Sequence, residues 1–140
     1  MFVNVVDYHG HTVGIDPNRV IKLRPALVQD DEPADCTLVD FASGGVLAMG
    51  DLSAVAPIFA PYIRLAKLHA PNGSPIMLNA DGIAAVTPPD LERNGNSMAV
   101  VKVEFENNRV PARNSIPLAE DTTAAEQILN DAKRSGEAQS

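Results

Sequence analysis

A repeated pattern in two stretches of the chain constrains its fold more than any other feature of the sequence. Residues 10–25 and 73–88 align without a gap at an offset of 63 residues, and each stretch opens on glycine and closes on proline. Six further pairs match in chemistry: Val13 and Ile76, Ile15 and Leu78, Asp16 and Asn79, Asn18 and Asp81, Val20 and Ile83, Leu23 and Val86. The alternative explanation of this match is that any two β-hairpins share a similar spacing of glycine and aliphatic residues. We interpret the repetition as an internal duplication of one small β-rich unit.

The first unit is expected to consist of short strands followed by one helix. Strand formers, alternation and turn residues predict strands at residues 2–9, 12–15, 19–24, 36–42 and 46–49. Asp51 or Ser53 is expected to cap a helix that runs to about Ala60, where Pro61 stops it. Pro57 should then lie in or near the first turn, because a later proline would break the helix.

The same order of elements is expected in the second half. The pattern predicts strands at residues 63–69, 76–79, 83–86, 97–106 and 109–113, with Phe105 matching Phe41 of the first half. Thr123 and Glu126 have the spacing of a capping box, which predicts a helix from there to about Lys133. Residues 135–140 lack an apolar anchor and are expected to form a free tail.

These elements define a fold class and three segments. The sequence predicts a mainly β protein with short helices, built from two pseudo-repeated small units that resemble β-barrels or sandwiches, each ending in a helix. The units are expected at residues 1–61 and 62–134, with the tail at 135–140. Aromatic residues make up only 4% of the chain and Trp is absent, so the core should be mainly Val, Ile, Leu and Ala.

The charge and the single cysteine limit the partners and the compartment. The net charge of −7 argues against binding to a nucleic-acid backbone, which needs clustered Lys and Arg. Residues 1–61 carry three basic and eight acidic side chains, which indicates a solvated acidic face or charge matching between subunits. No apolar run approaches the ~18 residues of a membrane span, residues 1–7 do not form a secretory signal, and Cys36 has no disulfide partner. We therefore expect a protein of the cytoplasm, or of a particle assembled there.

Residues able to carry chemistry are few and do not form a recognisable motif. His9 and His11 would face the same side of a strand and begin a zinc site, but a third ligand would have to come from His69, Cys36 or a carboxylate. The acidic stretch 30–35 lacks the glycine and the distal glutamate of a calcium loop. Cys36 is expected to be a small core residue. The sequence therefore predicts no catalytic residue, no cofactor and no metal site, and we expect that the chain is not an enzyme.

Each half resembles a known family of small bacterial proteins. The second half carries Asn72-Gly73, the step Ile76-Met77-Leu78-Asn79, Ile83 and Pro89-Asp90, and the first half carries Gly10, Val13-Gly14-Ile15-Asp16 and Val20. This pattern resembles the flagellar accessory proteins of the FlbD/SwrD type, here as a tandem duplication. That family is short and has a single unit, and the resemblance implies a role in motility without supplying catalytic residues.

Two functions are compatible with these observations. The first is a non-enzymatic structural or protein-interaction module that joins protein partners or further copies of itself in a larger assembly, such as a bacteriophage virion or a bacterial motility machine. This function is indicated by the duplication, by the many short strands whose edges are open to pairing, and by the lack of a recognisable set of catalytic side chains. The alternative is a β-barrel that binds a small ligand or a metal, and is possibly an enzyme, with His9, His11 and His69 as its polar groups.

Overall fold

The computed structural model describes residues 2–26, 34–41, 44–88, 99–103 and 115–138. Contacts divide the chain into two compact units, Met1–Ile63 and Arg64–Ser140. The division falls two residues after the boundary expected from the sequence. The described elements are mainly strands, with two α-helices and two short 3-10 turns.

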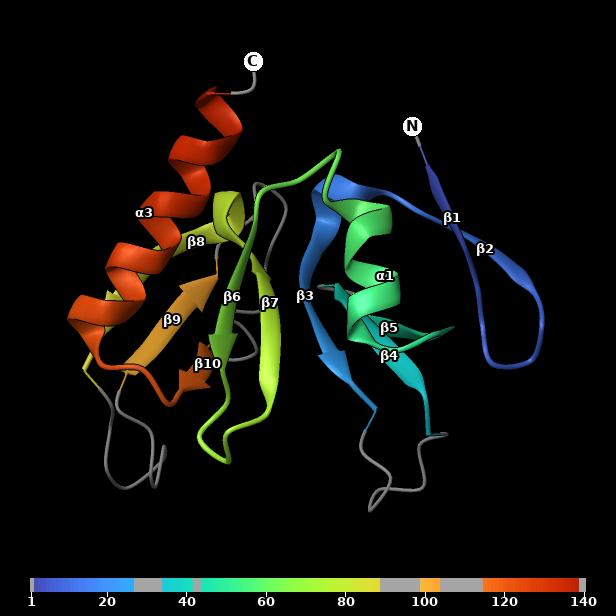
Figure 1. Ribbon diagram of the computed structural model, residues 1–140, viewed down its shortest axis with the longest axis horizontal. Helices are drawn as coiled ribbons and strands as arrows, with labels where there is room; N and C mark the ends of the chain where they lie inside the picture. The colour runs from blue at the N-terminus through green and yellow to red at the C-terminus, as the bar shows by residue number, and fades with distance from the viewer. Residues whose placement is uncertain (1, 27–33, 42–43, 89–98, 104–114, 139–140) are drawn as a thin grey trace. The chain divides into compact units, whose positions relative to one another are not determined.

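The first unit contains a hairpin, a three-stranded meander and one helix (Figure 1). Its elements are β1 (Val3–Val6), β2 (Thr12–Ile15), the 3-10 turn η1 (Pro17–Arg19), β3 (Val20–Pro25), β4 (Cys36–Phe41), β5 (Gly44–Met49) and α1 (Leu52–Phe59). Strand β1 pairs antiparallel with β2, and β4 pairs antiparallel with both β3 and β5. The hairpin meets the meander where Asp7 bridges Ala48 and the amide of Tyr8 donates to the carbonyl of Leu47.

Strand β1 is shorter than its apolar sequence predicts, because a side chain ends it. The carboxylate of Asp7 accepts hydrogen bonds from the backbone N–H groups of His9 (3.0 Å) and His11 (2.8 Å). These bonds take the place of ladder pairing and curl residues 7–11 into a turn. Gly10 closes the turn at a φ of 87°, a conformation that glycine adopts without steric cost.

Helix α1 begins where the sequence predicts, but its proline lies farther along the helix than expected. Asp51 is the N-cap, since its carboxylate accepts from the amide of Ala54 at 3.0 Å. Pro57 lies inside the helix and not in its first turn, so that expectation was wrong. Because proline has no backbone N–H, the carbonyl of Ser53 lacks the hydrogen bond that residue 57 would donate in a regular helix. Val55 and Phe59 are completely buried and hold the helix against β3 and β4.

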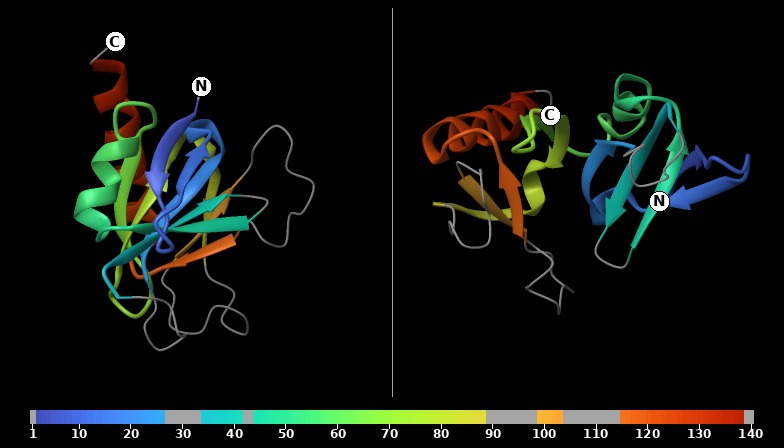
Figure 2. Two further views of the ribbon diagram at one scale, coloured as in Figure 1. Left: turned by 90° about the vertical axis from the view of Figure 1, so that its right-hand side faces the viewer. Right: turned by 90° about the horizontal axis from the view of Figure 1, so that it is seen from below.

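The second unit has the same order of elements (Figure 1). They are β6 (Leu65–His69), β7 (Pro75–Asn79), the 3-10 turn η3 (Ala80–Gly82), β8 (Ile83–Thr87), β9 (Ala99–Val103), β10 (Ser115–Leu118) and α3 (Thr122–Ala138). Strands β6 and β7 form a hairpin, and β9 pairs antiparallel with both β8 and β10. Figure 2 shows α3 lying along one face of the sheet β8–β9–β10, and Ala125 and Leu129 are its buried residues.

Both ends of α3 differ from the sequence expectation. The helix is capped by Asp121 and not by Thr123, because the Asp121 carboxylate accepts from the amide of Ala124 at 2.8 Å. The helix also continues to Ala138, so the free tail expected from residue 135 was wrong for the residues described. Helix elongation gains one hydrogen bond for each residue that it fixes, and no proline interrupts this segment. Residues 139–140 lie outside the described part of the chain.

The strand expected at residues 97–106 is observed as β9, and its register differs from the expected match. Val103 pairs with Ile83, in the position where Phe41 pairs with Val20. Phe105, which was expected to match Phe41, lies outside the described residues. The strand expected at residues 109–113 also lies outside them, and the described partner of β9 begins at Ser115.

The sheets of the described chain are open, so the expected barrels are not closed. In the first unit the hairpin touches the meander through the isolated bridge between Asp7 and Ala48 and does not form a continuous ladder there. Strand β2 has β1 as its sheet neighbour and β8 has β9, which leaves one edge of each strand outside the described sheets. A barrel requires ladder pairing around its full circumference, and these edges interrupt it.

Candidate functional site

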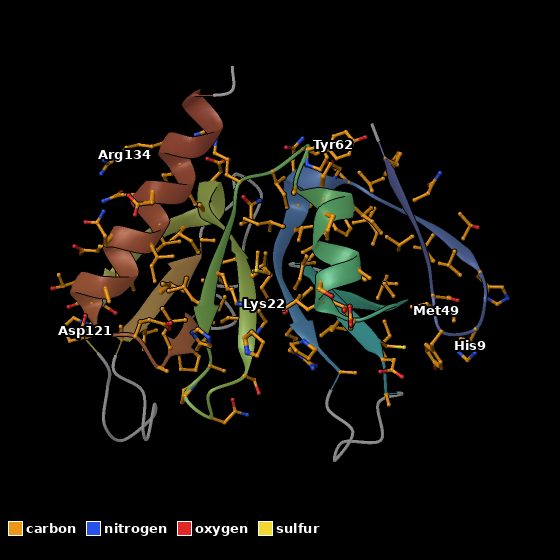
Figure 3. All side chains as sticks on the ribbon, in the orientation of Figure 1. His9, Lys22, Met49, Tyr62, Asp121 and Arg134 are labelled. Carbon is orange, nitrogen blue, oxygen red and sulfur yellow. The ribbon has the colours of Figure 1, made fainter. Side chains whose placement is uncertain are left out.

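The histidines of the first unit lie at the hairpin turn and not on a continuous strand face. The rings of His9 and His11 are 6.1 Å apart between centroids, and His9 stacks against Tyr8 at 3.8 Å. Figure 3 shows His9 at the tip of the hairpin. The hydrogen bond from the amide of His11 is the main reason why the pKa of Asp7 is lowered. This carboxylate already accepts two amide hydrogens, so its role is to fold the turn.

The third histidine belongs to the second unit and has a carboxylate partner of its own. The two oxygens of Glu120 accept from the backbone N–H of His69 (2.9 Å) and approach its ring Nδ1 (2.7 Å). Together with the bond from the amide of Ala119 to the carbonyl of His69, they fasten β6 to the segment that leads into α3. Among the described residues, no three His, Cys, Asp or Glu side chains converge as metal ligands.

Cys36 is a buried residue of β4, as expected, and it lines a hollow of about 500 Å³ at the start of α1. The polar side chains around this hollow include Asp35, Asp51 and Ser53. The Ser53 hydroxyl donates to the Asp51 carboxylate at 2.7 Å and is the main reason why the pKa of Asp51 is lowered. Asp51 and Ser53 therefore cap helix α1. Residues 30–33 of the acidic stretch lie outside the described part of the chain.

The hairpin of β1 and β2 carries an exposed apolar surface. Val6 of β1 and the flanking residues Phe2 and Tyr8 are 45%, 71% and 46% exposed, while Val3 and Val5 are buried. Met49, Ile58 and Tyr62 are the other exposed large hydrophobic residues of the described chain. All six belong to the first unit. Neither Pro nor a charged residue occurs in β2, and such residues are the usual protection of a sheet edge.

The second open edge, that of β8, forms one wall of a shallow groove. The groove has a volume of about 220 Å³. It is lined by Ile83, Ala85 and Val86 of β8 and by Glu126, Leu129, Asn130 and Lys133 of α3. Strand β8 also contains neither Pro nor a charged residue. The groove therefore combines backbone hydrogen-bonding groups, an apolar floor and two opposite charges, which is what an added β-strand requires.

Comparison with known proteins yields no relative. No family model matches the chain, and neither a curated protein nor a solved structure matches it. None of the helices in the described segments combines the length and the apolar character needed to span a membrane.

Sequence reasoning missed both the groove and the partner of His69. The strand at residues 83–86 was expected, but its place beside α3 depends on contacts between residues more than 40 positions apart. Glu120 lies 51 positions from His69, and no local pattern links them. The charge-free run from Ile83 to Thr87 was the available signal for an unprotected edge.

Proposed function

We propose that this chain is a non-enzymatic structural or protein-interaction module that acts within a larger assembly. The observation that carries the proposal is that two edge strands, β2 in the first unit and β8 in the second, contain neither Pro nor a charged residue. Open edges without charge or proline are templates for pairing with another chain. The exposed residues Phe2, Val6 and Tyr8 beside β2 add apolar surface of the kind that interaction sites use.

We infer further that the two units are copies of one ancestral unit. The hairpins support this, because Val3 pairs with Ile15 as Ala66 pairs with Leu78, in both cases at the offset of 63 residues. Their turns contain Gly10 and Gly73 at φ angles of 87° and 90°.

The turns that follow the hairpins support the same inference. The Asp16 carboxylate accepts from the amide two residues ahead, as does the Asn79 side chain. The helices correspond as well, since Asp51 and Asp121 are both N-caps and accept from the amide three residues ahead.

The setting that we favour is a bacteriophage particle or a bacterial motility machine. Open edges on two different strands, β2 and β8, suit a component that must join one neighbour through each of them. The resemblance of each half to flagellar accessory proteins of the FlbD/SwrD type supports the motility setting. Protein partners or further copies of the chain are the binding partners of this proposal.

The test is affinity capture of the full chain with and without a blocked edge. Thr12→Pro blocks β2, and Thr12→Val is the matched control that keeps the backbone N–H. Cross-linked complexes from the producing cells are identified by mass spectrometry, after urea unfolding has established equal stability of the three proteins. We expect the same complexes with the wild type and Thr12→Val, and their loss with Thr12→Pro. Complexes that survive Thr12→Pro, or none with the wild type, would refute the proposal.

A second candidate function is binding of a small ligand in the first unit. The hollow of about 500 Å³ beside Cys36 and Asp51 favours it, because small-molecule sites are concave and largely apolar. A thermal-shift screen against metals, nucleotides and metabolites tests it. A rise of the melting temperature that disappears in Cys36→Leu, a substitution that fills the hollow, would support ligand binding.

A further inference from the structure

We propose that copies of this chain associate head to tail, with β2 of one copy adding antiparallel to the edge of β8 in the groove of the next. The inference rests on the proposed function, because it names the partner of the same two edges. It is carried by the hydrogen-bond pattern of β2, by the groove between β8 and α3, and by the charges at the ends of both.

The donor edge has free backbone positions that can be identified. The amide of Asp7 donates to the carbonyl of His11, one position beyond Val6 and Thr12, which are the last pair of the β1–β2 ladder. Hydrogen-bonded and non-hydrogen-bonded pairs alternate along an antiparallel ladder. Val13 and Ile15 therefore bond to β1, and the N–H and C=O groups of Thr12 and Gly14 point away from it, toward the open edge.

The acceptor groove has the dimensions of a short strand. Strand β2 has four residues, which span about 13 Å at about 3.3 Å each. Glu126 and Lys133 mark the two ends of the α3 wall, and seven residues of helix span about 10 Å. Between them lies Leu129, which is buried, so the floor of the groove is apolar where the middle of the added strand would rest.

The direction of α3 relative to β8 decides which end of the groove is positive. Strands β8 and β10 are both antiparallel to β9, so they run parallel to each other. Helix α3 follows β10 directly, begins at the end of the sheet where β8 ends, and packs against η3, which precedes β8. Figure 3 shows Asp121 and Arg134 at opposite ends of this helix. Lys133 therefore lies toward the start of β8, and Glu126 lies toward its end.

Charge complementarity then selects one orientation of the incoming strand. Strand β2 is preceded by His11 and followed by Asp16. When β2 runs antiparallel to β8, Asp16 comes to the Lys133 end and His11 comes to the Glu126 end. When it runs parallel, the carboxylates of Asp16 and Glu126 come together. Like charges in one contact oppose association, so the antiparallel orientation is favoured.

A second copy is the occupant because one interface covers the open edge of β2 and fills the groove beside β8. The hairpin that supplies β2 also carries the exposed Phe2, Val6 and Tyr8. Because β2 and β8 are different surfaces, the contact is heterologous, and an open chain of subunits keeps one free edge at each of its two ends. Such a contact closes into a ring or continues as a filament.

The experiment measures the mass of the full chain by light scattering and sedimentation from about 1 µM to 1 mM, a range that covers weak to moderate affinity. Thr12→Pro removes one outward N–H of β2, and Ala85→Lys places a charge on the edge of β8. Each variant alone should be monomeric, with a dissociation constant raised at least about tenfold. The controls Thr12→Val and Ala85→Ser should assemble like the wild type.

Mixing the two blocked variants gives the sharpest readout. Each retains the edge that the other has lost, so an equimolar mixture should form a dimer and nothing larger. A monomeric wild type throughout the range, unchanged assembly of either blocked variant, or a mixture that stays monomeric would overturn the proposal. A monomeric wild type that still captures partners through β2 would refute the head-to-tail contact alone and leave the proposed function standing.

Reversal of single charges separates local pairing from net repulsion. Lys133→Glu changes the net charge from −7 to −9, and Glu126→Lys changes it from −7 to −5. Lys133→Glu should weaken assembly several-fold if Lys133 faces Asp16, whereas Glu126→Lys should weaken it only where His11 is protonated. Stronger assembly of Glu126→Lys would show that only the net charge matters and would overturn the assigned orientation.

Discussion

The ion pair between Lys22 and Asp40 should contribute little to stability, although each of its members is costly to remove alone. The two residues lie directly opposite each other on β3 and β4, with 4.0 Å between Nζ and Oδ2. Their side chains are 22% and 32% exposed. Burial is the main cause both of the raised pKa of Asp40 and of the lowered pKa of Lys22. The attraction between the charges therefore does not fully offset their desolvation.

The magnitudes support a test by a double-mutant cycle. Two unit charges 4 Å apart attract by about 4 kcal/mol at an effective dielectric constant of about 20, and desolvation costs several kcal/mol per buried ion. Lys22→Met or Asp40→Val alone should lower the free energy of unfolding by about 1–2 kcal/mol, because a half-buried charge is left without its partner. The double variant should lie within about 1 kcal/mol of the wild type or above it.

Urea unfolding followed by circular dichroism measures these differences. The coupling between the two sites should be about 1–3 kcal/mol. Single-variant effects that add in the double variant would show that the pair is not coupled, and would refute the reasoning.

The pH dependence of the same variants provides a second measurement. Because the pKa of Asp40 is raised, the stability linked to its proton is present below the ordinary value of 3.8 and is lost as the pH rises through the raised pKa. For Lys22 the lowered pKa makes stability rise between that pKa and 10.5. Both slopes should be absent from the double variant. Slopes that persist there would assign the pH dependence to other groups.

Three further predictions concern local structure, and urea unfolding measures each of them. Asp51→Ala and Asp121→Ala should each cost about 1 kcal/mol through the loss of an N-cap, whereas asparagine at either position should cost little; equal stability of the alanine variants would contradict the caps. Gly10→Ala and Gly73→Ala should each cost about 1–2 kcal/mol from the positive φ alone, since open space surrounds both positions; an unchanged unfolding midpoint would contradict this. Pro57→Ala should raise the free energy of unfolding by about 1–2 kcal/mol. This is less than the ~3 kcal/mol that an interior proline costs a helix, because proline also restricts the unfolded chain. A loss of stability would mean that the proline ring makes a contact that the fold needs.

The sequence by itself determined the local elements of this protein. Alternating aliphatic residues mark strands wherever one face is buried, and glycine at positive φ marks the hairpin turns. Asp51 was recognisable as one of two candidate caps, with Ser53, because capping involves residues only three positions apart. The buried position of Cys36 was expected for the same kind of reason, since it begins an apolar strand.

Only the tertiary structure decided the features that depend on distant residues. The tolerance of Pro57 depends on the burial of Val55 and Phe59 against the sheet, which offsets a backbone bond that the local sequence forbids. The open sheets, the groove between β8 and α3 and the partner of His69 depend on which segments meet in space. Local propensity and periodicity do not specify these contacts, because many arrangements of the same strands bury the same apolar faces.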